Sequence, residues 1–179
     1  FLRLAAVSPM LGVPDTAAEL MASVAGGDSA PLAGIQTTHQ TDLALSSLAG
    51  ADRGSLLRLG RWMHDGGSAV LRVNATGILA KTSSADMLDE VALTLGRDSE
   101  VRDLYVWALS TRVGYRTGAL AAEVLNPRDA GARWCAAWLL GQDGSPAARA
   151  ALTVALRREQ LRENVRAIGL MLNGADPCM

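Results

Sequence analysis

The chain has 179 residues, a formal net charge of −1 and hydrophobic residues at 49% of its positions. This hydrophobic fraction is high enough to bury a continuous core and argues against an intrinsically disordered chain. A dedicated nucleic-acid-binding protein usually carries an excess of basic residues, so the charge balance argues against that class. Aromatic residues make up only 4% of the chain, and the core must therefore be built mainly from Ala, Leu and Val.

The two cysteines, Cys135 and Cys178, provide no disulfide framework. Cys135 lies in an apolar helical segment and is interpreted as a small core residue, whereas Cys178 is predicted to be a free thiol. The sequence contains no apolar run of about 20 residues and no signal peptide. We therefore expect a cytoplasmic protein that does not bind membranes. Because the chain begins at Phe1, we interpret it as a fragment or processed product of a longer protein.

Residues 1–67 are predicted to form an N-terminal helical cap or degenerate repeats. A short helix over residues 2–12 is interrupted at Pro9, because proline removes a helix hydrogen bond. Thr16 and Glu19 have the spacing of a capping box, which predicts the start of the next helix.

Turn-forming residues dominate positions 26–34 and predict a loop there. A helix is expected over residues 35–49. The following helical segment has Leu59 and Met63 on its apolar face and ends at Gly66, which is a common residue at helix ends.

An arginine recurs at nearly regular intervals from residue 68 onward. Consecutive copies are separated by 30, 31 and 33 residues, and each copy begins a segment with helical periodicity. Ser145 followed by Pro146 is a strong start signal for a second type of helix between the copies. The arginines are Arg72, Arg102, Arg133 and Arg166. The predicted second helices cover about residues 84–95, 117–126 and 147–158.

Each repeat is too small to bury its own apolar face, so neighbouring repeats must stack into one continuous core. We therefore predict an all-α fold of stacked helical hairpins with about 8–11 helices in a single continuous domain. The predicted units lie near residues 68–99, 100–130, 131–163 and 164–179.

The segment from Ala132 to Gly141, followed by an Ala- and Leu-rich helix at 147–156, resembles HEAT-like repeats of the short phycobilisome-lyase type. Those repeats contain an apolar residue and an arginine, then alanines, then Ala-Leu-Gly and a leucine-rich helix. The match is closest over residues 131–174 and does not extend to residues 1–67. The resemblance implies a right-handed α-solenoid whose second helices line a concave face. It constrains the fold far more than the function.

Asn74 departs from this repeat pattern. The equivalent positions in the other copies hold Leu104, Cys135 and Ile168. Asn74 also begins the sequence Asn-Ala-Thr, which fits a glycosylation sequon. We discount that modification because the site is predicted to lie in the middle of a helix in a chain without a secretory signal.

The arginine column has two interpretations, a row of cations that face a ligand or a set of structural side chains. Recurrence in every unit favours structural salt bridges with neighbours such as Asp103, Asp129 and Glu163. Among the tryptophans, Trp107 and Trp138 occupy equivalent repeat positions and are predicted to lie in the core. Trp134 follows its arginine directly and is predicted to be the exposed aromatic, a residue type that favours binding surfaces.

His64 lies beside Asp65 at a predicted helix end, but no other ligand-type residue has metal-site spacing with it. We therefore predict no catalytic residue, no metal site and no cofactor. Gly66, Gly67 and Ser68 precede a helix, and we interpret them as a helix end and a turn rather than an anion site.

The second helices change from acidic near residue 86 to basic near residue 157. This gradient predicts a concave face for charge-complementary partners, and the alternative is a solvated helix surface. The residues expected to contact a partner are Trp134, Arg149, Arg157, Arg116 and Glu123.

These features predict a non-enzymatic α-solenoid module that binds another protein or a peptide, as the interaction or sensory part of a bacterial regulator. Nucleic acid is not an expected partner. The alternative is a HEAT-like enzyme, such as an alkylpurine DNA glycosylase with Trp, Asp and Arg in a basic groove, or a lyase-type protein.

Overall fold

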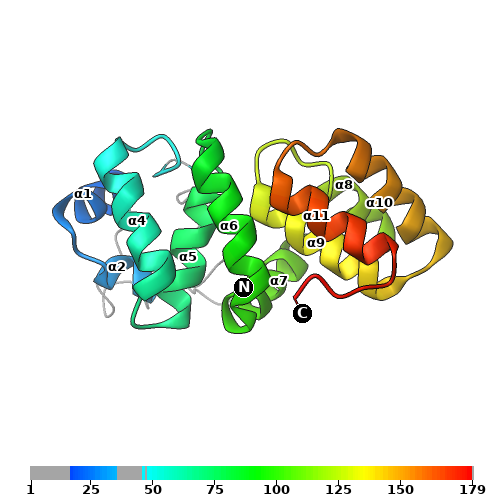
Figure 1. The fold of residues 1–179 in the computed structure, drawn as a ribbon. Coiled ribbons are helices and arrows are strands. Elements are labelled where there is room, and N and C mark those ends of the chain that lie inside the picture. The colour runs from blue at the N-terminus through cyan, green and yellow to red at the C-terminus, as the bar shows by residue number, and fades with distance from the viewer. Residues whose placement is uncertain (1–16, 36–45, 47, 179) are drawn as a thin grey trace, which may run out of the picture.

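The computed structural model describes residues 17–35, 46 and 48–178 of the chain. These residues form α-helices and no strand, which confirms the predicted all-α class for this part of the chain (Figure 1). None of their helices is long and apolar enough to cross a bilayer. The helices are α1 (Ala17–Gly26), α2 (Ala30–Gly34), α4 (Arg53–Asp65), α5 (Ala69–Leu79), α6 (Ala85–Arg97), α7 (Ser99–Val113), α8 (Thr117–Glu123), α9 (Ala130–Asp143), α10 (Pro146–Arg158) and α11 (Arg162–Leu172).

Several of these helices begin at a side chain that accepts a hydrogen bond from the backbone N–H three residues later. Such a bond satisfies one of the N–H groups that has no partner within the helix. The predicted start of α10 is confirmed, because Ser145 Oγ accepts from Ala148 N at 3.2 Å and Pro146 is the first helical residue. The residues that cap α4, α5, α7, α9 and α10 in this way are Asp52, Ser68, Asp98, Asp129 and Ser145.

The region predicted as a loop over residues 26–34 contains the short helix α2. Pro31 is compatible with the first turn of a helix, where its missing N–H is not needed. The Ala30 N–H also donates to Asp28 Oδ1 at 3.0 Å. The loop prediction is therefore wrong for Ala30–Gly34, where proline begins a helix rather than preventing one.

Other N-terminal predictions are only partly covered. The predicted helix over residues 2–12 and the capping residue Thr16 lie outside the described residues, as does most of the helix expected over residues 35–49. The predicted end of α4 is confirmed, since Gly66 N donates to the Trp62 carbonyl at 3.0 Å and closes the helix.

The helices that begin the predicted units pack against one another in chain order. α5 contacts α7, α7 contacts α9, and α9 contacts α11. α8 and α10 also pack on α9, and α6 contacts α9 and α11 in addition to α7. In Figure 1, α6 lies between the N-terminal helices and the group formed by α9 and α11. As a result, α9 is surrounded on more sides than any other unit helix.

The core is one hydrophobic cluster that extends through the described helices from Leu20 in α1 to Met171 in α11. Small side chains give α9 its close packing, since Ala132, Ala136 and Ala137 are each at most 1% exposed. Helices with alanine at their contacts can approach closely. The alanine-rich composition is therefore used where the helices are most crowded.

Tyr105 of α7 lies between α5 and α9. A Cβ atom added to Gly131 in α9 would lie 2.8 Å from the Tyr105 ring, and one added to Gly77 in α5 would lie 3.7 Å from it. The first distance is too short for a real contact, whereas the second is ordinary van der Waals contact. Gly131 is therefore required for this packing and Gly77 is not.

Candidate functional site

Two of the arginines in the repeated column form salt bridges with side chains outside their own helices. Arg72 Nη2 lies 2.8 Å from Glu100 Oε2, and its Nε lies 3.5 Å from Asp98. Arg133 Nε lies 2.7 Å from Glu159 Oε2. These contacts support the structural interpretation of the column over a row of ligand-facing cations.

The other two arginines differ from them. The Arg102 guanidinium lies 5.1 Å from the centre of the Trp138 ring, a cation–π contact, and its Nε lies 3.0 Å from Asp103. The Arg166 side chain is 72% exposed and lies 3.9 Å from Glu163. The expected pairs of Arg102 with Asp103 and of Arg166 with Glu163 are present, and the second is the more exposed.

The tryptophan prediction is wrong for two residues. Trp134, predicted to be exposed, is 2% exposed, whereas Trp107, predicted to lie in the core, is 52% exposed. The reason is the surroundings of the helices, because α9 is enclosed by five others while α7 packs chiefly on α5, α6 and α9. Trp134 therefore packs in the core and is not the exposed aromatic that the sequence predicted. Trp138 is half-buried against the core, as expected.

The remaining predicted partner residues do not form one site. Arg116, Arg149 and Arg157 are exposed, and Arg149 Nη2 donates to the Leu172 carbonyl at the end of α11 at 2.9 Å. Glu123 is half-buried and accepts hydrogen bonds from Arg112 at 3.3 Å and from the Asn126 amide at 3.0 Å. Among the described residues, no hydrogen bond or ion pair joins these four predicted residues to one another.

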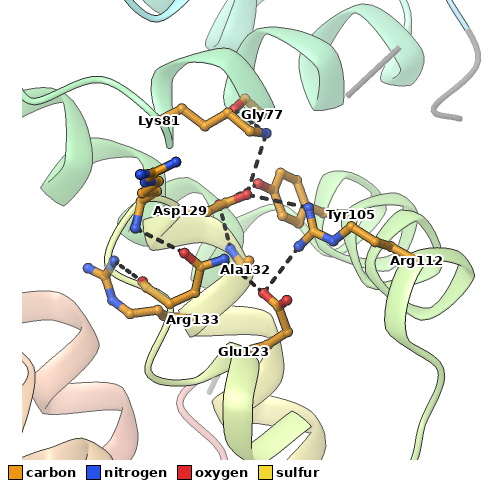
Figure 2. Close-up of polar contacts among 10 residues, drawn as sticks. Gly77, Lys81, Tyr105, Arg112, Glu123, Asp129, Ala132 and Arg133 are labelled. Carbon is orange, nitrogen blue, oxygen red and sulfur yellow. Dashed lines mark hydrogen bonds and ion pairs between the residues drawn. The ribbon is translucent and has the colours of Figure 1, made fainter. Parts of the chain in front are cut away.

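The most concentrated polar cluster surrounds Asp129, which caps α9. Asp129 Oδ1 accepts hydrogen bonds from the Tyr105 hydroxyl at 2.9 Å and from Ala132 N at 2.8 Å. Its Oδ2 lies 3.5 Å from Lys81 Nζ and 3.9 Å from Arg112 Nη1. Figure 2 shows Tyr105 and Arg112 from α7 and Lys81 from the segment after α5 directed toward Asp129. The Asp129 carboxylate is 96% buried, and its partners compensate for the loss of water.

Burial controls the protonation of the groups beside Asp129. Burial raises the pKa of Tyr105 well above 10.0, and the negative charge of Asp129 raises it further. The Tyr105 hydroxyl therefore stays protonated and donates to Asp129. Burial likewise raises the pKa of the Cys135 thiol, and the negative charge of Asp129 raises it further. Cys135 is fully buried and unpaired, as predicted for a core residue.

A second set of contacts extends the cluster toward α10 and α11. Glu159 accepts from Arg133, from Asn164 Nδ2 at 3.0 Å and from Leu161 N at 3.0 Å. Burial by itself raises the pKa of Glu159, but the hydrogen bonds from these three groups outweigh it, and the pKa falls below 4.5. Arg133 Nη1 also donates to the Asn126 carbonyl at 3.0 Å, which connects the two sets of contacts.

A groove of about 970 Å³ opens beside this cluster. Its walls come from three segments, residues 80–83 after α5, residues 124–129 before α9 and residues 158–161, which begin at the last residue of α10 and continue to α11. The Ala130 N–H donates to the Ala80 carbonyl at 3.1 Å and ties the first wall to the second. The groove therefore has a fixed frame built by three units of the chain.

The groove is lined by more positive than negative side chains. Its basic residues are Lys81, Arg112, Arg128, Arg133 and Arg158, and its acidic residues are Asp129 and Glu159. Lys81, Arg112 and Arg133 have carboxylate partners in Asp129, Glu123 and Glu159. Within the described residues, Arg128 and Arg158 are exposed and have no carboxylate partner.

The other residues considered from the sequence have structural surroundings. His64 Nε2 lies 2.8 Å from Glu90 Oε1, so His64 connects α4 to α6 rather than pairing with Asp65. Ser68 Oγ accepts from Leu71 N at 3.1 Å, which makes it a helix cap. The described residues contain no cluster of three or more metal-ligating side chains.

Asn74 is an internal anchor for α2. Its side-chain amide donates to the Leu32 carbonyl at 2.7 Å and to the Ile35 carbonyl at 3.0 Å, and Asn74 is 1% exposed. Glycosylation is incompatible with this burial. Cys178 is unpaired, as predicted, and packs against the core.

The sequence contains a signal for the Asp129 cluster that the arginine spacing alone does not use. The residue four positions before each of the first three arginines is a helix cap: Ser68 before Arg72, Asp98 before Arg102 and Asp129 before Arg133. The fourth copy has Arg162 at this position. A repeat pattern that includes the cap position therefore predicts Asp129 at the start of α9.

Comparisons with known proteins add no relationship to this description. No protein-family model matches the chain, and comparisons with curated proteins and with solved structures find no match either.

Proposed function

We propose that this chain is a non-enzymatic module that binds a segment of another protein, with the groove between residues 80–83, 124–129 and 158–161 as the binding site. The observation that carries the proposal is the groove itself, about 970 Å³ in volume and bordered by Arg128 and Arg158, which have no carboxylate partner among the described residues. Binding sites are concave and are held by a largely preformed frame. The bond between Ala130 N and the Ala80 carbonyl contributes to such a frame.

We further propose that the helices form a HEAT-like right-handed α-solenoid of stacked hairpins. The series of contacts from α5 through α7 and α9 to α11 supports this architecture. The contacts of α6 with α9 and α11 join non-adjacent units, which is a departure from a solenoid in which each unit contacts only its neighbours. We propose that such a module is the interaction or sensory part of a bacterial regulator in the cytoplasm. In this role its groove would recognise the partner.

Two properties of the groove favour binding over catalysis. Its carboxylates are saturated, because Asp129 is held by Tyr105, Ala132 and Lys81, and Glu159 by Arg133. A general base needs a lone pair directed at its substrate. The groove lining among the described residues also contains no tryptophan, which the DNA-glycosylase alternative requires. The thiol in the middle of the chain, Cys135, is fully buried, which argues against its use in the lyase alternative.

A peptide display experiment tests the proposal. The immobilised protein is used to select from an unbiased peptide library, and each selected peptide is then measured against two double variants. Arg128→Glu with Arg158→Glu changes the groove, and Arg149→Glu with Arg157→Glu makes the same charge change on the surface predicted from the sequence. We expect the first variant to lose the selected peptides and the second to keep them. Enrichment of no peptide contradicts the proposed function, and loss of binding only in the second variant places the site on α10.

A further inference from the structure

Some basic side chains of the groove have no carboxylate partner among the described residues. Three of its five basic side chains are neutralised by Asp129, Glu123 and Glu159. Arg128 and Arg158 lack such a partner among the described residues, and both are exposed at the border of the groove. An anionic ligand could therefore form ion pairs with these two side chains without displacing a carboxylate of the protein.

These two cations lie on different walls. Arg128 belongs to the segment that precedes α9, and Arg158 is the last residue of α10. Two cations on different walls can each pair with a separate negative group of one ligand.

Apolar side chains also line the groove, together with uncharged polar residues such as Thr82, Asn126 and Gln160. The apolar residues include Leu88, Val124, Leu125, Pro127, Ala155 and Leu161. Contacts with these residues would favour a ligand that carries an apolar group between its negative groups.

The lining favours a peptide over nucleic acid. No Phe, Tyr, Trp or His is among the described lining residues, so bases have no aromatic surface on which to stack. The two negative side chains, Asp129 and Glu159, also interrupt any continuous positive track for a phosphate backbone. An acidic side chain is a compact group that can reach Arg128 and Arg158 individually.

We infer that the groove binds an acidic peptide segment in which carboxylates pair with Arg128 and Arg158 and an apolar side chain packs against apolar lining residues such as Pro127 and Leu161. This inference rests on the proposed function and specifies its ligand. The pairing is electrostatic, so the affinity should fall as ionic strength rises.

The test uses fluorescence anisotropy with a short fluorescein-labelled peptide in which Glu and Leu alternate. Matched peptides have every Glu replaced by Gln or by Lys, and a single-stranded DNA oligonucleotide is the fourth probe. We expect the Glu peptide to bind, the Gln peptide to bind about tenfold more weakly or less, and the Lys peptide not to bind. Arg128→Glu with Arg158→Glu should weaken binding of the Glu peptide by at least about tenfold, while Arg149→Glu with Arg157→Glu should not. Thermal unfolding of each variant checks that the fold is retained.

Each contrary result has a distinct meaning. Equal affinity for the Glu and Gln peptides, or unchanged affinity after reversal of Arg128 and Arg158, overturns the acidic ligand. Tighter binding of the oligonucleotide that is lost on the same reversal replaces the peptide with nucleic acid. If the unbiased library yields neutral peptides that depend on the groove, the acidic ligand fails and the proposed function survives. If it yields no groove-dependent peptide, the proposed function itself fails.

Discussion

α5 and α9 occupy equivalent places in the repeat series, but different chemistry holds each of them. At the same repeat position, α5 has Asn74, whose amide bonds to carbonyls of the α2 region, and α9 has Cys135, which is fully buried. At the repeated arginine, Arg72 pairs with an exposed carboxylate, Glu100, whereas Arg133 pairs with Glu159, whose side chain is 4% exposed.

The difference follows from what surrounds each helix. α9 is covered by α6, α7, α8, α10 and α11, so its apolar contacts are extensive and its ion pair is shielded from water. α5 meets the short helix α2, whose terminal carbonyls need a donor. The repeat therefore determines where a helix lies, and the local neighbours determine which side chain is stable there.

The largest expected effect on the free energy of unfolding comes from removing a tryptophan of α9, which is enclosed by more helices than α7. Trp134→Ala should lower the free energy of unfolding by about 3–5 kcal/mol, because it leaves a cavity where a 2% exposed indole packs. Trp107→Ala, on α7, should cost about 1 kcal/mol or less, because that side chain is half in water. Urea denaturation measures both values. Similar losses in the two variants would contradict the assigned exposure of these tryptophans.

The next effect tests the position that Asn74 and Cys135 share. Asn74→Cys should cost about 2–3 kcal/mol, because the Leu32 and Ile35 carbonyls lose a buried donor. Cys135→Asn should cost a similar amount, because the amide would be buried among apolar groups. Thermal and urea unfolding of the single variants and of the double exchange give the comparison. Full stability of the exchanged chain would show that the two sites are interchangeable, contrary to this prediction.

A smaller effect uses the two glycines on either side of Tyr105. Gly131→Ala should destabilise the fold by about 2 kcal/mol, because the added methyl group would lie 2.8 Å from the ring. Gly77→Ala should be neutral or stabilising by up to about 1 kcal/mol, because its methyl group has an ordinary contact distance and alanine favours helix. Differential scanning calorimetry of both variants measures the contrast. A more damaging change at Gly77 than at Gly131 is the opposite of what the packing requires.

The smallest expected effect is a difference in pH dependence between the ion pair of Arg133 with Glu159 and the ion pair of Arg72 with Glu100. Hydrogen bonding lowers the pKa of Glu159 in the folded chain below 4.5, so this carboxylate stabilises the fold above about pH 4.5, and the stabilisation is lost as the pH falls through the folded pKa. Glu159→Gln should therefore lower the free energy of unfolding by about 1–2 kcal/mol at pH 7. The difference in free energy of unfolding between this variant and the unaltered chain should become smaller as the pH falls.

Glu100→Gln is the matched control, because the Glu100 side chain is 66% exposed. Its cost should be below about 1 kcal/mol at pH 7 and should decrease with added salt. Urea unfolding of both variants at pH 7 and pH 3 provides the measurement. A Glu159→Gln cost that stays constant down to pH 3 would contradict the role assigned to its charge.

Local signals in the sequence predicted much of the fold. The arginine spacing located α5, α7, α9 and α11, and the pair Ser145 and Pro146 located the start of α10, because caps and periodicity depend on residues close in the chain. The exposure of Trp107 and Trp134 could not be read in this way. It depends on how many helices cover α7 and α9, and the repeat spacing does not contain that information.

The candidate site was less predictable than the fold for the same reason. Arg128, Asp129 and Arg158 come together only because three segments of the chain meet, and no spacing rule connects them. The sequence instead directed attention to Arg149 and Arg157, which share a helix and are therefore easy to recognise as a pair. The residues of the groove share no such pattern.

The hydrogen bond from Ala130 N to the Ala80 carbonyl also has a consequence for motion. Together with the chain between them, it closes a ring that contains α6, α7 and α8. The Ala130 amide can exchange its proton with solvent only when this ring opens, because the donor is covered while the bond is intact. Its exchange rate therefore reports how often the contact between Ala80 and Ala130 opens, at a single amide in the wall of the groove.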